Sequence, residues 1–252
     1  MPRAPGETAS ALVHKPSALV HKAERAIAEV GVPGLAFGIS NDRETEFGAA
    51  GNVDADQLFR VASVTKPFVA ALVLRLVEDG RVSLDDPIPR YLPELSLPAG
   101  SVTLRQLLSH QAGLGHEWTT PLVDYGDGDD ALDRLARGGP VAAATGPGEW
   151  FSYSSAGYYI AAAVAARVTG TTFEGAMQAR LLEPLGLRRT TFELAEAERL
   201  GLAPGEPVEY PRARRGGGGL FSCVADLIAF AEHLLGTPSP LAEMAVPQAR
   251  TD

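Results

Sequence analysis

The stretch LFRVASVTKP at residues 58–67 places a serine, Ser63, three residues before a lysine, Lys66. This spacing puts both side chains on one face of a helix, one turn apart. An amine beside a serine hydroxyl can activate that hydroxyl as a nucleophile. Because such a tetrad is common by chance, its meaning depends on partner groups elsewhere in the chain. The helix itself is predicted by apolar residues at helical spacing, which are Val69, Leu72, Val73 and Leu76.

The composition is that of an acidic chain that can bury a core. Of 252 residues, 45% are hydrophobic and 21% are charged, which predicts a folded protein of one large domain or two small ones. The net charge is −9, from 22 basic and 31 acidic residues. A nucleic-acid binder needs a basic face, so the charge argues against a nucleic-acid partner.

Residue patterns predict neither a metal site nor a membrane span. The single cysteine, Cys223, excludes an internal disulfide and a thiolate cluster, and we expect it to be a small buried residue. The five histidines lack ligand spacings such as H-E-x-x-H. The sequence contains no uninterrupted apolar run near the roughly 18 residues that a membrane-spanning helix needs.

The N-terminal residues 1–22 form a predicted extension with a short direct repeat. The segment SALVHK occurs at residues 10–15 and again at 17–22. The N-terminus has no apolar signal region, so we expect a cytoplasmic protein; a secreted or periplasmic location stays open if the start is assigned wrongly. A helix near 18–30 leads into a domain that we expect to cover residues 23–252.

Two apolar runs predict a β-hairpin near the N-terminus. They span residues 33–40 and 44–52 and are separated by polar turn residues. A two-stranded hairpin is marginal by itself and needs more strands or a packed helix. Few strand signals follow, so the pattern favours an α+β protein dominated by helices. These helices are expected after a capping box at Thr103, near 130–137, from Ile160 to Gly170, over 172–183 and after an N-cap at Ser222.

A second segment, PGEWFSYSSAGY at residues 147–158, gives the tetrad its context. Together they resemble the serine β-lactamase and penicillin-binding-protein superfamily, most closely its class C β-lactamase and family VIII esterase branch. The resemblance covers about residues 23–250, and several motifs in order are far more specific than one. The other matching segments are GRVSLDDP at 80–87, YLPE at 91–94, LLSHQAGL at 107–114 and GGLFS at 218–222.

This resemblance implies a β-lactamase/transpeptidase-like fold, with a helical region packed beside an antiparallel sheet, and an acyl-enzyme mechanism. In such a mechanism Ser63 attacks a carbonyl, and Lys66 and Tyr153 share the transfer of its proton to the leaving group. Which of the two is the base stays open. The backbone N–H of Ser63, near a helix N-terminus, would supply one half of an oxyanion hole.

One departure from the family pattern concerns the substrate. The tyrosine motif is usually Y-x-N, but Ser155 stands here in place of the asparagine. A short hydroxyl thus replaces an amide that can both donate and accept. The resemblance gives that amide a role in holding substrate amides, so Ser155 favours a short-chain ester over a β-lactam or a D-amino peptide. Gly218 and Gly219 are the other expected substrate-binding residues, since glycines let the backbone pass close to the site.

A second departure is the third family motif. Relatives carry K-T-G, or a His/Trp-x-Gly variant, on a later strand that lines the site, and no such triplet follows Asp226. We therefore expect the C-terminal strands of the sheet to be missing. The chain would then be a truncated gene product, a protein that completes its sheet with a partner such as a second copy of itself, or an enzyme of weak activity.

Two hypotheses for the function follow. The first is a serine hydrolase that acts on an ester or amide through an acyl-enzyme, without a metal or an organic cofactor. The second is a catalytically impaired relative that serves as a binding or partner protein, or is a truncated gene product. A Ser-His-Asp triad that uses His110 is the weaker alternative, because its neighbours fit a structural loop and no third member is identifiable.

Overall fold

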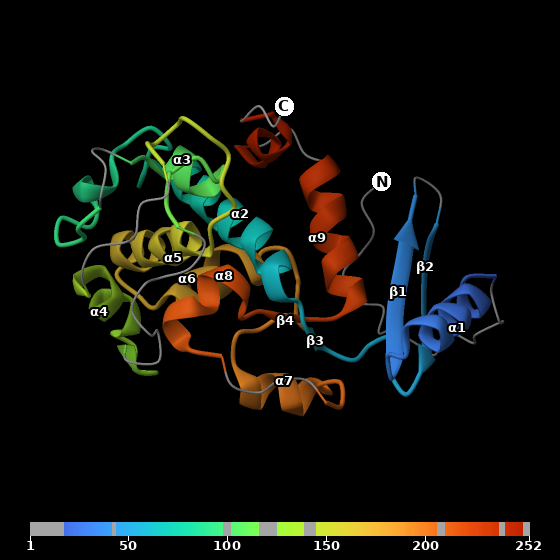
Figure 1. Cartoon of the computed structure of the whole chain (residues 1–252). Coiled ribbons are helices and arrows are strands. Elements are labelled where there is room, and N and C mark those ends of the chain that lie inside the picture. The colour runs from blue at the N-terminus through green and yellow to red at the C-terminus, as the bar shows by residue number, and fades with distance from the viewer. Residues whose placement is uncertain are drawn as a thin grey trace.

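A helical body and a β-hairpin, with one long helix between them, make up the described part of the chain (Figure 1). The computed structural model describes residues 18–41, 44–97, 102–115, 125–138, 145–205, 210–236 and 240–248. The first copy of the predicted repeat lies outside these ranges, and the domain boundary at residue 22 stays a prediction. Within them, every helix is too short or too polar to cross a membrane.

The predicted hairpin is confirmed. β1 (Gly34–Ser40) and β2 (Thr45–Gly51) pair antiparallel, with Gly34 opposite Gly51. The predicted first helix is also present as α1 (Ala18–Val30), and it packs chiefly against β2. The antiparallel sheet expected beside the helical region is therefore present, and one of its faces is covered by a helix.

The hairpin packs on the helical body through α9 (Val224–Gly236), which lies beside β1 (Figure 1). The closest approach is at Gly38, where a Cβ atom would lie 2.5 Å from Cδ1 of Ile228. A residue with a side chain would push the helix away, so the glycine sets the spacing. Ser40 also hydrogen-bonds Glu232 of α9. Two packed helices thus support a hairpin that would be marginal alone.

The core of the helical body is formed by two helices that are buried on nearly all sides. In α2 (Thr65–Glu78) most side chains are buried, and in α5 (Ser155–Thr169) the first eleven residues are buried without a break. Phe68 of α2 stacks on Phe230 of α9, with ring centroids 3.8 Å apart. Such helices need cover all round. The elements around them include α3 (Leu104–Leu108), α4 (Ala131–Arg137), α6 (Phe173–Met177) and α8 (Arg215–Gly218).

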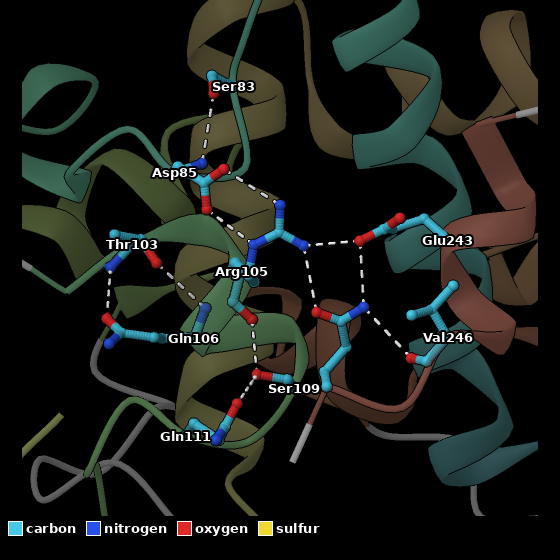
Figure 2. A network of polar contacts seen from close by, with 10 residues as sticks. Ser83, Asp85, Thr103, Arg105, Gln106, Ser109, Gln111, Glu243 and Val246 are labelled. Atoms are coloured by element: carbon cyan, nitrogen blue, oxygen red, sulfur yellow. Dashed lines mark hydrogen bonds and ion pairs between the residues drawn. The ribbon is translucent and has the colours of Figure 1, made fainter. Parts of the chain in front are cut away.

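A network centred on Arg105 attaches the last described residues to α3 (Figure 2). The Arg105 guanidinium donates to Asp85 at 2.7 Å and to Glu243 at 2.7 Å. Glu243 belongs to the 3-10 helix η6 (Pro240–Ala245). The predicted capping box at Thr103 is confirmed beside this network, with both of its reciprocal hydrogen bonds present. One arginine therefore connects a loop, a helix and the C-terminal segment.

A second small sheet brings the nucleophile segment to the later part of the chain. β3 (Phe59–Arg60) pairs antiparallel with β4 (Phe221–Ser222). The predicted N-cap role of Ser222 is wrong, because Ser222 lies in β4 and its Oγ atom lies 2.9 Å from Oγ1 of Thr190. Cys223, which follows it, is buried as expected. Residues near 60 and near 220 thus become neighbours.

The segment before β4 is held in place by Glu174, a glutamate that is only partly exposed. Glu174 of α6 accepts hydrogen bonds from Arg212 at 3.0 Å and from Arg215 at 2.7 Å, and its side chain is 12% exposed. Burial raises the pKa of Glu174, but the two arginines more than offset this and hold that pKa below its ordinary value. Because Arg212 and Arg215 flank the start of α8, these contacts, the Glu174 clamp, fix the position of the glycines that follow.

We expect Glu174→Gln to lower the free energy of unfolding by about 2 kcal/mol at neutral pH, because two half-buried arginines lose the carboxylate that they share. The folded-state pKa of Glu174 lies below its ordinary value of 4.5. Its charged contacts therefore stabilise fully above that value and are lost as the pH falls through the folded-state pKa. Urea denaturation at stepwise lower pH should show the difference between the two proteins shrinking.

The control for this experiment is Glu196→Gln, whose carboxylate pairs with Arg199 on the surface. This change should leave the stability nearly unchanged at every pH. If the stability difference between the original protein and Glu174→Gln stays constant or grows as the pH falls, Glu174 does not act as a charged partner of the two arginines.

Candidate active site

Ser63 lies on a single 3-10 turn directly before α2. This turn, η1, spans Ala62–Val64, and Ala62 has a left-handed φ of 45°. That conformation costs a non-glycine residue about 1 kcal/mol. Thr65 Oγ1 holds the turn, since it donates to the Ala62 carbonyl at 2.7 Å and accepts from the backbone N–H of Leu220 at 3.2 Å. Ser63 is thereby left exposed.

Lys66 is 4% exposed, and its amine is bound by two oxygens. Nζ donates to Oγ of Ser63 at 3.1 Å and to the carbonyl oxygen of Gly217 at 2.7 Å. It also lies 4.9 Å from the ring centroid of Tyr153, within the range of a cation–π contact. The Oγ to Nζ distance is within the range for direct proton transfer. The structure therefore brings Ser63 and Lys66 together, as their spacing predicts.

Two tyrosines lie near Lys66, and their surroundings differ. Tyr158 is 5% exposed, and its hydroxyl donates to the carbonyl oxygen of Leu108 at 2.8 Å. Burial, together with the nearby Tyr153, raises the pKa of the Tyr158 phenol above its ordinary value, so it stays neutral. Tyr153 is 39% exposed. Of these two side chains, Tyr153 is the one that can exchange a proton with a substrate.

A pocket of about 160 Å³ opens at Ser63. The predicted residues Ser155 and Gly218 line it, and Ser155 is the first residue of α5. Gly219 is not among the lining residues; it is buried, and its N–H donates to the carbonyl of Arg215 at 3.1 Å. The described lining consists of Arg60, Ala62, Ser63, Tyr153, Ser155, Tyr210, Arg214, Gly217 and Gly218.

Sequence reasoning missed Gly217, which supplies an oxygen to Lys66. A Cβ atom there would lie 2.5 Å from the ring of Tyr159, and a Cβ atom on Gly218 would lie 2.7 Å from the hydroxyl of Tyr210. Glycine at 217 therefore lets the backbone lie against that ring, and a side chain at 218 would displace the Tyr210 hydroxyl. The available signal was the run of four glycines at 216–219, but the resemblance covered only the last two.

His110 positions the segment that carries Tyr153. Its Nδ1 accepts a hydrogen bond from the backbone N–H of Ser154 at 3.1 Å, and its ring stacks on that of Tyr153 with centroids 4.5 Å apart. Its own carbonyl accepts from the N–H of Ser152 at 2.8 Å. To accept in this way, Nδ1 must be unprotonated. These contacts agree with the interpretation of His110 as a structural loop residue, placed directly beside the site.

The chain matches one family model, described as Beta-lactamase, over residues 19–252. It is 33% identical over 246 residues to the esterase EstB of Burkholderia gladioli, which covers 78% of this chain and 62% of that protein. It is 32% identical to penicillin-binding protein 4 of Amycolatopsis lactamdurans, over 68% of this chain and 48% of that protein. The solved structure of a class C beta lactamase from Rhodobacter sphaeroides has a TM-score of 0.74 at 26% identity, and the match covers 91% of this chain and 70% of that one.

These two curated relatives are longer than the chain. The chain spans 62% of EstB and 48% of penicillin-binding protein 4, so it corresponds to about half or somewhat more of their length. The likeness to the solved structure confirms the β-lactamase/transpeptidase-like fold that the motifs imply. The roles of Ser63, Lys66 and Tyr153 stay predictions of the sequence, with which their geometry is consistent.

Two substitutions of His110 distinguish the effect of its hydrogen bond to Ser154 from the effect of its ring contact with Tyr153. His110→Phe keeps a ring against Tyr153 but leaves the Ser154 N–H without an acceptor, which costs about 1–3 kcal/mol. His110→Asn retains an acceptor and tolerates the left-handed φ of 59° at this position. We expect His110→Phe to slow the labelling of Ser63 by a fluorophosphonate about tenfold, and His110→Asn to slow it much less.

The measurement is the labelling rate by intact-mass spectrometry, with circular dichroism to show that each variant is folded. If His110→Asn is the slower of the two, the ring and not the acceptor positions Tyr153, and this account of the contact is wrong.

Proposed function

The chain belongs to the beta-lactamase family of serine hydrolases, and we propose that it hydrolyses short-chain esters through an acyl-enzyme on Ser63. The observation that carries this proposal is the 3.1 Å contact between Nζ of Lys66 and Oγ of Ser63, at a pocket that Tyr153 also lines. Of the relatives, EstB is an esterase by name and the Amycolatopsis protein is a penicillin-binding protein by name.

In the proposed reaction, Oγ of Ser63 forms a bond to the ester carbonyl carbon as its proton passes to the Lys66–Tyr153 pair. The bond to the alcohol oxygen then breaks, and the pair gives this proton to the leaving alcohol. Water then attacks the acyl carbon and loses a proton to the same pair. The bond from this carbon to Oγ of Ser63 breaks, and the pair gives the proton to Oγ, which releases the acid and free Ser63. Each half-reaction therefore returns the pair to its starting protonation state.

The geometry defines two ways in which the pair can begin this cycle. If Lys66 is neutral, its lone pair can take the Ser63 proton directly across 3.1 Å. If Lys66 is charged, it cannot accept, and a Tyr153 phenolate stabilised by the ammonium beside its ring must do so. In both cases the contact with the Gly217 carbonyl fixes the amine on the side of the hydroxyl.

The negative oxygen of the intermediate needs a hydrogen-bond donor. Ser63 lies in the first turn of η1, where backbone N–H groups have no partner inside the helix. Its N–H is therefore a donor placed beside its own Oγ, which supports the proposal of one oxyanion contact at this point.

Formation of the acyl-enzyme is tested by incubating the protein with a fluorophosphonate and locating the adduct by peptide mass spectrometry. We expect one adduct, on Ser63, because its hydroxyl is exposed at the pocket and in contact with the Lys66 amine. Ser63→Ala should carry no adduct, whereas the control Ser83→Ala should be labelled like the original protein. Folded protein that takes up no adduct would reject the proposal and favour the alternative of an impaired relative that binds a partner.

The preference for esters is tested with p-nitrophenyl butyrate and a chromogenic cephalosporin. Because Ser155 lines the pocket and lacks the amide that holds substrate amides in the family pattern, we expect kcat/KM to be at least about tenfold higher for the ester. Ser155→Asn should shift the ratio toward the cephalosporin. Faster turnover of the cephalosporin by the original protein would refute this role of Ser155.

A further inference from the structure

We infer that Trp150 and Phe151, the aromatic pair, bind an apolar alcohol part of the ester outside the pocket at Ser63. This inference rests on the proposed function and names the substrate class of the same site. Among the phenylalanine, tyrosine and tryptophan residues that the structure describes, three side chains are exposed, and all three lie in residues 150–153. Trp150 is 66% exposed and Phe151 is 46% exposed, and the third is the pocket residue Tyr153. Apolar side chains that gather in one exposed patch mark a binding surface, whereas scattered ones do not.

The aromatic pair lies close to the pocket. A chain advances at most about 3.6 Å per residue, so the Cα atom of Trp150 lies within about 11 Å of the Cα atom of Tyr153. The ring of Phe151 meets the ring of His110 edge-on, with centroids 5.6 Å apart, and His110 in turn stacks on Tyr153. Val64, which follows the nucleophile directly, is also exposed. An apolar group joined to a carbonyl at the nucleophile is therefore close to apolar side chains.

The backbone that carries the aromatic pair is held on both sides. Before the pair, the N–H of Gly148 donates to the carbonyl of Gln111 at 2.7 Å. After it, the N–H of Ser152 donates to the carbonyl of His110 at 2.8 Å. The two rings are thus presented to solvent by a fixed segment. A surface that is already ordered loses little conformational entropy when a ligand binds, which favours binding.

The pocket itself offers little contact to a large apolar group. Apart from two tyrosine rings, its described lining has no apolar side chain larger than that of Ala62. Its volume of about 160 Å³ suits the short acyl group of the proposed substrate. The alcohol part then lies on the other side of the carbonyl, outside the pocket, where an indole or phenyl ring can pack against it. An ester of a short acid with an aromatic alcohol, such as benzyl butyrate, fits both surfaces.

Turnover of two esters with the same acyl group tests the inference. Benzyl butyrate and methyl butyrate release alcohols of similar acidity, so titration of the released acid compares contacts made by the benzyl ring. We expect kcat/KM to be roughly tenfold higher for the benzyl ester. Trp150→Ala should remove most of this preference, and Trp150→Phe should retain most of it.

Phe151→Ala should lower the preference and also slow both esters, because its ring contacts His110. Leu235→Ala, which removes an exposed apolar side chain on α9, is the control and should change neither rate. Equal kcat/KM for the two esters in the original protein, or an unchanged preference in Trp150→Ala, would overturn the inference.

Binding without turnover separates this inference from the proposed function. Ser63→Ala protein cannot form an acyl-enzyme, and saturation-transfer NMR detects the benzyl ring of benzyl butyrate when it contacts the protein. We expect a signal with this protein and a much weaker one when Trp150→Ala is added. Binding that depends on Trp150, together with no fluorophosphonate adduct on Ser63 in the original protein, would reject the proposed hydrolase and leave the aromatic surface standing. Hydrolysis of both esters without binding that depends on Trp150 would reject the surface alone.

Discussion

The buried amine of Lys66 is the contact on which the other parts of the site depend. An ammonium or amine can be removed from water only if its hydrogen bonds are replaced. One replacement, Ser63, is local, but the other is the carbonyl of Gly217, 151 residues later in the chain. The helix that carries the lysine therefore requires the glycine segment beside it. The β3–β4 pair and the Glu174 clamp are the means by which that segment is held there.

The segment from Arg212 to Gly218 has two roles. Some of its arginines form ion pairs with Glu174, and other residues line the pocket at Ser63. The guanidinium groups of Arg212 and Arg215 are paired with the carboxylate of Glu174, and these ion pairs fix the backbone of the segment. Arg214, between them, contacts aromatic groups and lines the pocket. Arg212 and Arg214 belong to one short 3-10 turn, η5 (Arg212–Arg214). Such a turn has little stability by itself, so the contacts of Arg212 and Arg215 with Glu174 help to fix Arg214 at the pocket.

Local patterns predicted much of the fold, and contacts distant in sequence account for what they missed. The hairpin, the capping box at Thr103 and the S-x-x-K helix depend on neighbouring residues and were found where expected. Two-residue strands such as β3 and β4 have no periodicity to detect, so Ser222 was mistaken for an N-cap. Gly217 was missed for a related reason, because it contacts Lys66 from a position 151 residues away in the chain.

The spacing of the tetrad predicts that Ser63 and Lys66 lie on one face of a single helix. In the structure they lie in two different helical elements and differ in burial. The serine is exposed on a 3-10 turn, and the lysine is buried in the following α-helix. This change of geometry requires the left-handed backbone of Ala62, which is strained by about 1 kcal/mol. The hydroxyl of Thr65 offsets that strain, because it bonds the Ala62 carbonyl and also accepts from Leu220 beside β4. Thr65, one of the two variable positions of the S-x-x-K motif, thus connects the turn that carries Ser63 to the segment beside β4.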